Sequence, residues 1–290
     1  MTLSAERALA SSSKITGAQV LAPAIAGSCA ILSFYDTRTQ LLRVACTGDC
    51  RAVLGRRDGS KWTVTQLSSD QTGANPAEIK RVQAEHPNEP AVTKNGRLLG
   101  YEPSRAFGDA VLKWSRETSN ALRRRFYAKR PNDICVTPPY MTAEPVITTT
   151  KIQPEKGDFL VLASDSLWEL LSNEEVVGLV GQFIDKGHLM PERATKSQTS
   201  LMGWVPRFWK RDSETMVSNV KATEVPESEK PYGNGPVRPA QWGISKRPRT
   251  TVFKDVNVAT HIARNGLGGD DHDMIASLFM LAGSNTRRFR

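Results

Sequence analysis

Apolar residues gather in short, strand-sized runs along the first half of the chain. The run GSCAILSFYD (27–36) predicts a buried strand that ends at Asp36, and residues 40–68 predict two or three further strands with turns at Thr47–Asp49 and Asp58–Gly59. Asp-Gly between apolar runs is a strong hairpin signal. Strands this close in sequence must pair antiparallel, because a parallel crossover needs a dozen or more residues.

Helical patterns alternate with these strands. NPAEIKRVQAEHP predicts a helix that begins after a capping Asn75, has Pro76 in its first position and ends at His86–Pro87. SNEEVVGLVGQFI predicts another, opened by a capping box of Ser172 and Glu175. The remaining patterns predict a hairpin over 94–100, a loop entering a helix over 102–114, extended chain over 138–152 and helices over 116–130, 258–268 and 272–282. Strands, helices and strands again, with antiparallel neighbours, indicate an α+β layered domain.

The stretch FLVLASDSLWELLS (159–172) raises the question of function. The apolar run GDFLVLAS predicts a strand buried on both sides that ends on Asp165, and Glu169 follows one helical turn later. Asp49 lies at another strand-to-strand turn. Carboxylates that folding brings together at strand ends are the donors that Mg²⁺ and Mn²⁺ require. Each also has a structural explanation, because turn aspartates bond backbone amides and Glu169 could be a solvated helix residue.

The composition changes between Lys186 and Asp255. This segment holds seven of the 17 prolines and thirteen Lys or Arg against seven Asp or Glu, so we expect a long, partly disordered, basic insertion at about 186–257. Its aromatic residues at helical spacing predict either an amphipathic segment facing a partner or membrane, or side chains packed back on the domain: Trp204, Phe208 and Trp209.

Composition and motifs exclude several classes of protein. The chain is 39% hydrophobic and 24% charged, as in soluble domains, and no apolar run reaches the length of a transmembrane helix. The net charge of +9 comes mainly from the insertion and no nucleic-acid motif accompanies it, so we expect no nucleic-acid function. The four cysteines are too scattered for a disulfide framework and indicate a reducing interior: Cys29, Cys46, Cys50 and Cys135.

Serine-nucleophile and zinc chemistry are not expected either. Ser164 and Ser166 flank Asp165, but they lack the G-x-S-x-G elbow and an evident histidine partner. The Cys46-x3-Cys50 spacing has no second pair, and the four histidines show no paired zinc spacing.

Seven segments in a fixed order resemble the metal-dependent serine/threonine protein phosphatases of type 2C. They are GSCAILSFYD, ACTGDCRAVLG, LSSDQTG, HPNE, GRLLGYEPSRAFGD, FLVLASDSLWELLSNEEVV and ARNGLGG. The resemblance covers about 20–185 and 258–290. The stretches LKW, AEHPNE and ARNGLGGDDHD look most like the mitochondrial pyruvate dehydrogenase phosphatase branch of the family.

The resemblance implies a four-layer αββα sandwich of two antiparallel sheets flanked by helices. It implies two or more Mg²⁺ or Mn²⁺ ions per complete site, which activate a water for attack on phosphorus. By resemblance Asp165 is a metal ligand, Asp49 belongs to an additional, weaker metal site, and Glu169 is the second acidic residue of that site. Arg105 and Asp109 match a motif that supports the flap near the site rather than the metals.

The departures from the family pattern matter as much. No Asp-Gly-His segment, which supplies a bridging aspartate and a histidine acid, occurs here, and the early phosphate-binding arginine and the last metal aspartate are not identified. Ser166 replaces a glycine and would be strained if that position needed a positive φ. We therefore expect a partial phosphatase domain over 27–290, an N-terminal helical remnant over 1–26, exposed sheet edges and little activity. No catalytic residue is assigned.

Partners and location follow from the resemblance only. We expect a monomer acting on a phosphorylated protein, with a pyruvate dehydrogenase subunit as a candidate, in the mitochondrial matrix or alternatively the cytoplasm. Two other hypotheses stay open. One is a phosphatase-like binding module or gene-model fragment without turnover, and the other is an interaction protein whose basic insertion binds an acidic surface.

Overall fold

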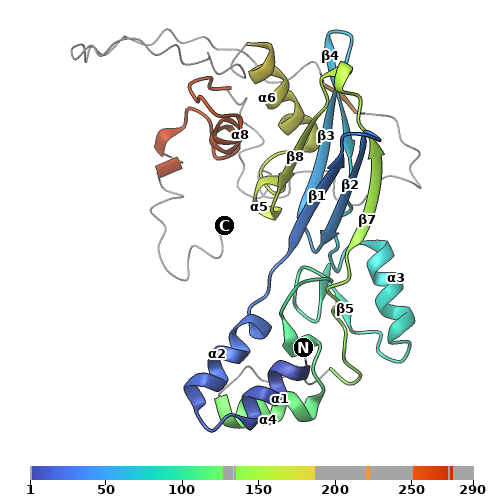
Figure 1. The fold of residues 1–290 in the computed structure, drawn as a ribbon, viewed down its shortest axis with the longest axis vertical. Helices are drawn as coiled ribbons and strands as arrows, with labels where there is room; N and C mark the ends of the chain where they lie inside the picture. The colour runs from blue at the N-terminus through green and yellow to red at the C-terminus, as the bar shows by residue number, and fades with distance from the viewer. Residues whose placement is uncertain are drawn as a thin grey trace, which may run out of the picture. The chain divides into compact units, whose positions relative to one another are not determined.

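The computed structural model describes residues 2–126, 133, 135–186, 220–222, 251–273 and 275–276 (Figure 1). The chain divides into two units. Among the described residues, the first unit takes those up to Asp165 except 55–65, and the second takes 55–65 and those after Asp165. No helix in the described ranges is long and apolar enough to cross a membrane.

The first unit is built on an antiparallel sheet of order β1-β2-β7, formed by β1 (Ala30–Asp36), β2 (Leu41–Thr47) and β7 (Val146–Lys151). In the register of this sheet, Ala45 lies opposite both Leu32 and Ile147. Directly opposed residues point to the same face, so these three side chains share one face of the sheet. The antiparallel pairing of β1 with β2 confirms the prediction made from their short connection.

The inner face of this sheet packs against a second layer of strands. Leu42 and Val44 of β2 form one cluster with Ala52 and Leu54 of β3 (Arg51–Asp58), and Leu160 of β8 (Phe159–Ala163) packs against it. Each large apolar side chain buried in such a cluster stabilises the fold by about 1.5–3 kcal/mol. Two facing layers of strands with helices alongside confirm the α+β fold class.

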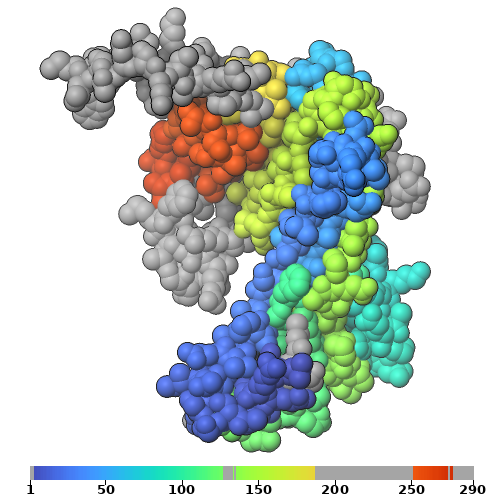
Figure 2. All heavy atoms as spheres, in the orientation of Figure 1, coloured from blue at the N-terminus to red at the C-terminus, as the bar shows by residue number. Residues whose placement is uncertain are grey.

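The strands are less buried than their apolar sequences predict. On the outer face of the first sheet Leu32 is 69% exposed, Phe34 61% and Ile147 62%, and β1 lies at the surface in Figure 2. In β8 all side chains are partly exposed, and Leu162 is 39% exposed. The predictions that β1 is buried and that β8 is buried on both sides are therefore wrong. An apolar run shows that a strand can be covered, not that a second layer covers it.

Three helices form a separate cluster in the first unit: α1 (Thr2–Ala10), α2 (Lys14–Ile25) and α4 (Arg116–Phe126). Figure 1 shows them side by side, and their core contains Ala8, Leu21 and Leu122. Arg125 of α4 donates hydrogen bonds to the carbonyl oxygens of Leu9, at 2.9 Å, and of Ser11. It thereby satisfies carbonyl groups at the end of α1, where a helix leaves them without partners.

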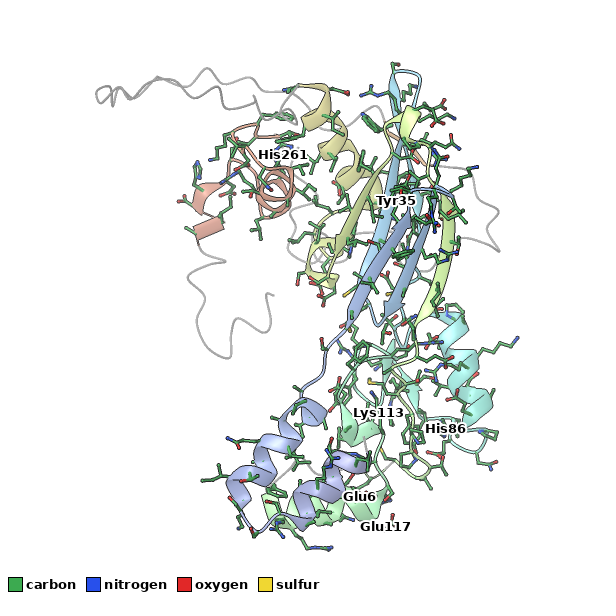
Figure 3. All side chains as sticks on the ribbon, viewed as in Figure 1. Glu6, Tyr35, His86, Lys113, Glu117 and His261 are labelled. Carbon is green, nitrogen blue, oxygen red and sulfur yellow. The ribbon has the colours of Figure 1, made fainter. Side chains whose placement is uncertain are left out.

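Helix α3 (Pro76–Glu85) confirms its predicted bounds. The side chain of Asn75 accepts a hydrogen bond from the backbone N–H of Ala77 at 2.9 Å, and Pro76 is the first helical residue. His86 follows the helix and is labelled in Figure 3. Its ring nitrogens lie 2.8 Å from Thr137 Oγ1 and 3.2 Å from the carbonyl oxygen of Pro139, so the helix end holds that later segment.

Two predicted hairpins are also confirmed. Strands β5 (Thr93–Lys94) and β6 (Arg97–Leu98) pair across Asn95–Gly96. Both turn residues have positive φ, 53° and 71°, as a two-residue hairpin turn of this kind requires. In the other hairpin β3 ends at Asp58, and β4 (Lys61–Gln66) begins three residues later.

The second unit is centred on α6 (Asn173–Asp185). Its capping box is confirmed, because the Ser172 side chain accepts from the backbone of Glu175 while the Glu175 carboxylate accepts from the backbone of Ser172. Helix α8 (Val258–Gly266) contributes the buried His261, whose ring lies 5.2 Å from that of Phe183 and 4.8 Å from that of Phe253.

One strand of the second unit lies within the predicted insertion. Strand β9 (Val220–Ala222) pairs in parallel with β4. Residues 187–219 and 223–250 of the insertion, which include the aromatic segment at 202–212, lie outside the described residues. The same holds for the ends of the helices predicted over 116–130 and 272–282.

Candidate metal centre

A cavity of about 370 Å³ opens in the first unit. Four of the residues that line it carry carboxylates: Asp49, Glu102, Asp109 and Asp165. The others are small or weakly polar, namely Gly27, Ser28, Cys29, Cys50, Pro103 and Ser164. The cavity thus collects acidic groups from segments that are far apart in sequence.

Asp49 is placed by a buried glutamine. It follows Gly48, whose φ of +103° is a backbone conformation that glycine adopts far more readily than other residues do. The Gln71 side chain accepts from the N–H of Gly48 at 2.7 Å and donates to the carbonyl of Cys46 at 3.1 Å. The backbone N–H of Gln71 donates to the carbonyl of Gly48 at 3.0 Å. These three bonds fix the turn that presents Asp49.

Asp165 reaches the cavity from the end of β8. It is the first residue of the short helix α5 (Asp165–Trp168) and is exposed. Ser166 is the second residue of α5 and is not among the residues with positive φ. The strain expected from a serine at this position is therefore not found, because helical backbone suits any L-residue here.

The charge on Asp49 is disfavoured by its surroundings. Burial raises the pKa of Asp49 from its ordinary value to about 6; a hydrogen bond from Cys29 acts against this, while the charges of Asp165 and Glu102 add to it. Asp49 is partly buried. The ionised group therefore lies where a cation would be favourable, since it would offset both the lost hydration and the repulsion.

The cavity thiols keep their protons at neutral pH. Burial, reinforced by the charge of Asp49, raises the pKa of the Cys29 thiol far above its usual range. The same two causes raise the pKa of Cys50 to about 11. Neutral thiols are poor metal ligands, so the carboxylates dominate the chemistry of the cavity.

Asp109 closes another side of the cavity. It has a left-handed backbone, φ 44°, and its carboxylate lies directly against Gly27: a Cβ added to that glycine would sit 2.1 Å from Asp109 Oδ2. Ser28 and Phe107 exchange backbone hydrogen bonds of 3.0 and 2.8 Å, which hold the two segments together. Lys113, labelled in Figure 3, donates to the carbonyl of Ala106 at 2.6 Å nearby in sequence.

Arg105 is engaged by protein groups of the first unit. Its guanidinium forms an ion pair of 2.7 Å with Glu78, and both side chains are nearly buried. It also donates to the carbonyl of Glu144 at 2.9 Å. Ser104 donates to the same Glu78 carboxylate at 2.8 Å. Burial acts to raise the pKa of Glu78, but the bonds from Arg105 and Ser104 outweigh it and the pKa is lowered.

The structure brings two of the three predicted metal ligands together. Asp49 and Asp165 line the same cavity, and the charge of one acts on the other. Glu169 lies in the turn after α5, is partly buried, and is not among the residues that line this cavity. Its role therefore stays a prediction.

The prediction did not include Glu102 and Cys29. Glu102 lines the cavity and forms a 2.9 Å ion pair with Arg97. A signal for Glu102 was available, because it lies only three positions before Arg105, where the RAFGD motif begins. Cys29 carried no comparable signal, because a lone cysteine at the start of a strand resembles any small core residue.

The donor set fits a hard divalent cation in kind. Asp165 and Glu102, whose charges raise the pKa of Asp49, are also carboxylates. Carboxylate oxygens are the ligands that Mg²⁺ and Mn²⁺ prefer. Within the ranges the structure covers, no three His, Cys, Asp or Glu side chains are arranged to hold a metal ion. Asp49 and Asp165 are therefore two of the four carboxylates of a candidate site.

Comparisons with known proteins point to one family. The profile of the family described as Protein phosphatase 2C matches residues 3–200. A protein phosphatase 2C homolog of Schizosaccharomyces pombe is 39% identical over 276 residues, covering 94% of this chain and 52% of that protein. A mitochondrial protein of Saccharomyces cerevisiae named [pyruvate dehydrogenase [acetyl-transferring]]-phosphatase 1 is 38% identical over 278 residues, covering 92% of this chain and 45% of its own.

The human protein of that name is more distant, 31% identical over 296 residues, covering 93% of this chain and 47% of its own. The chain spans about half the length of the curated relatives it matches. Among solved structures, a serine-threonine phosphatase 2C from Toxoplasma gondii covers 60% of this chain and 52% of its own, with 17% identity and a TM-score of 0.39.

Proposed function

Because this chain belongs to the protein phosphatase 2C family, we propose that it takes part in Mg²⁺- or Mn²⁺-dependent hydrolysis of phosphoserine and phosphothreonine in proteins. The observation that carries the proposal is the position of Asp49 and Asp165, two carboxylates from distant segments that line one cavity, where the charge of Asp165 helps to raise the pKa of Asp49. The fold places these two mutually repelling carboxylates close together, and a bound cation would offset their repulsion.

The residues of the chain have separate tasks in this proposal. When bound, the divalent cation supplies Lewis acidity and a water of lowered pKa. Asp165 offers its exposed carboxylate from the start of α5, and Asp49 offers its own from the turn fixed by Gln71. Arg105 and its partner Glu78 hold the neighbouring loop that carries Glu102. We propose Glu169 as a further acidic residue of the complete centre.

We propose a phosphorylated subunit of pyruvate dehydrogenase as substrate and the mitochondrial matrix as location. The relatives at 31% to 38% identity whose names give that activity and that organelle support both proposals. We further propose that the chain acts as a monomer.

A second candidate is a phosphatase-like module that binds phosphoproteins without turning them over. The donor set of the cavity favours it, because the described residues offer two predicted ligands there and the sequence contains no Asp-Gly-His. This candidate and the enzyme differ in turnover but not in phosphopeptide binding.

A phosphopeptide assay with and without Mn²⁺ tests the proposed function. We expect slow phosphate release that requires Mn²⁺ and that falls by about 100-fold in Asp165→Asn, because the substitution removes a charged ligand. The matched control is Asp36→Asn, because Asp36 is an aspartate at the end of β1 that does not line the cavity.

Two results would decide against the enzyme. Phosphate release that needs no divalent cation, or that Asp165→Asn leaves unchanged, would contradict the metal-dependent mechanism. Phosphopeptide binding without any release would favour the binding module instead.

A further inference from the structure

The segment HPNE (86–89) carries two titratable side chains that the proposed function does not use. His86, labelled in Figure 3, caps the end of α3, and the N–H of Glu89 donates to the carbonyl of His86 at 3.1 Å. The two side chains are only 5% and 11% exposed, and His86 Nδ1 lies 4.0 Å from Glu89 Oε1. A titratable pair covered this well needs hydrogen-bond partners to be stable.

Both carboxylate oxygens of Glu89 accept a hydrogen bond. The hydroxyl of Tyr140 accepts from the backbone N–H groups of Val136, at 2.5 Å, and Thr137, at 2.8 Å. Its own proton is therefore left for Glu89 Oε2, at 2.5 Å, while the hydroxyl of Thr137 donates to Glu89 Oε1. Burial acts to raise the pKa of Glu89, but these two bonds outweigh it and the pKa is lowered. Glu89 is thus an ionised acceptor that uses the one hydroxyl proton of Thr137.

Both ring nitrogens of His86 then face oxygen atoms that have no proton to give them. Nε2 lies 3.2 Å from the carbonyl oxygen of Pro139. Nδ1 lies 2.8 Å from Thr137 Oγ1, whose proton is directed at Glu89. Each of these contacts is a hydrogen bond only if the ring nitrogen supplies the proton. The ring therefore needs two protons, which makes it a cation.

The groups around the ring suit a positive charge. The centroid of the Tyr140 ring lies 4.3 Å from that of His86, a distance at which an aromatic ring attracts a cation. Beside His86 the described residues place two titratable groups, Glu89 and Tyr140, and Cys135 belongs to the same buried cluster as Tyr140. Burial, together with the bond to Glu89, raises the pKa of Tyr140, so its hydroxyl keeps its proton. The charge on the ring is therefore balanced by Glu89.

This network ties the end of α3 to a segment that holds one wall of the cavity. The N–H of Tyr140 donates to the carbonyl of Leu112 at 2.9 Å, and the N–H of Ala106 donates to the carbonyl of Thr142 at 3.0 Å. In sequence, Ala106 and Leu112 lie on either side of Asp109, which lines the cavity. A proton gained or lost in the network thus acts on the segment to which the loop carrying Asp109 is bonded.

We propose that His86 is a proton-operated latch, a doubly protonated ring that holds the segment from Val136 to Tyr140 against the end of α3. Loss of one ring proton leaves either Pro139 O or Thr137 Oγ1 without its donor. In the unfolded chain a histidine is mostly neutral above about pH 6.5, so the folded chain binds this proton more tightly. The stability that the latch provides is therefore present at low pH and is lost as the pH rises.

NMR of the ¹⁵N-labelled histidine rings in the metal-free full chain at pH 7.5 tests the latch, because a free imidazole is mostly neutral there. We expect N–H signals from both ring nitrogens of His86, assigned by their absence in His86→Gln. Thr137→Val removes the acceptor of Nδ1 at nearly constant shape and should leave one ring N–H, whereas Thr137→Ser should keep both. The control Thr142→Val, which removes a hydroxyl bonded to the backbone of Glu144, should also keep both. A single ring N–H at His86 in the wild type would overturn the proposal.

Urea unfolding of the wild type and Thr137→Val at two pH values tests the consequence for the fold. At pH 6 we expect the unfolding equilibrium constant of the variant to exceed that of the wild type by about tenfold, as for loss of a hydrogen bond to a charged group. At pH 9 the ratio should be clearly smaller, because the wild-type ring has then lost its second proton. The same ratio at both pH values would overturn the proton dependence. Neither measurement requires a metal ion or a phosphorylated substrate, so both are independent of the proposed function.

Discussion

Asp49 carries a cost that a structural turn aspartate would not. Turn aspartates are usually stabilised as anions by nearby N–H groups, as Asp36 is, where the backbone N–H of Arg38 lowers the pKa. For Asp49, burial raises the pKa to about 6 and thus opposes ionisation. The two aspartates follow similar strand ends in the sequence, and only the fold separates their roles.

The raised pKa predicts that the metal-free fold is more stable with asparagine at position 49. Between the unfolded value near 4 and the folded value of about 6, the native state binds the proton more tightly. The stability this provides is therefore present at low pH and is lost as the pH rises through about 6. Allowing for the partial exposure of Asp49, the substitution Asp49→Asn should raise the free energy of unfolding by about 1–2 kcal/mol at pH 7.5.

Urea unfolding in EDTA at pH 7.5 and pH 4 measures this difference. At pH 4 the carboxyl group is largely neutral and the gain should almost disappear. Asp36→Asn is the control of opposite sign, since its pKa is lowered and its charge favours the fold at neutral pH. A wild-type chain more stable than Asp49→Asn at pH 7.5 without metal would contradict the assignment of a destabilised carboxylate.

Helix ends could be predicted from sequence because their chemistry is local. Asn75 and the Ser172–Glu175 pair satisfy backbone groups within three residues of themselves, so the letters alone carry the information. The burial of β1 and β8 could not be predicted in the same way. Whether Leu32 or Leu162 is covered depends on segments far away in the sequence.

Gly181 in α6 predicts an exception to helix propensity. Alanine normally stabilises a helix interior relative to glycine by about 1 kcal/mol. Here a Cβ would lie 2.3 Å from an indole carbon of Trp62, which is held by its own bond to Asp185 at 3.3 Å. We expect Gly181→Ala to lower the free energy of unfolding by about 1–3 kcal/mol through overpacking.

Chemical denaturation followed by tryptophan fluorescence measures the effect of Gly181→Ala. A second variant, Gly181→Ala with Trp62→Phe, should recover part of the loss because the smaller ring leaves room for the methyl group. A single variant as stable as wild type would show that α6 can move away from the ring without cost.

At the scale of the whole molecule, the order of the sequence motifs along the chain indicated the family better than any single residue did. The seven ordered segments carried the resemblance, and the comparisons confirm the family. The convergence of Asp49 with Asp165 could be expected only through that resemblance, since 116 positions separate them in the chain. Cys29 became visible only in the fold, because a lone cysteine at the start of a strand carries no signal of a shared cavity, whereas Glu102 could have been considered from its place next to the RAFGD motif.

The central claim is that the carboxylates of Asp49 and Asp165 bind a divalent cation at one shared site. The most direct measurement is Mn²⁺ binding to the full chain, followed by electron paramagnetic resonance, for wild type, Asp49→Asn, Asp165→Asn and the double variant. We predict that each single substitution weakens Mn²⁺ binding by about tenfold or more. The double variant should bind Mn²⁺ only slightly more weakly than the single variant with the lower affinity, because both substitutions affect the same site. Wild-type affinity in both single variants would contradict the account.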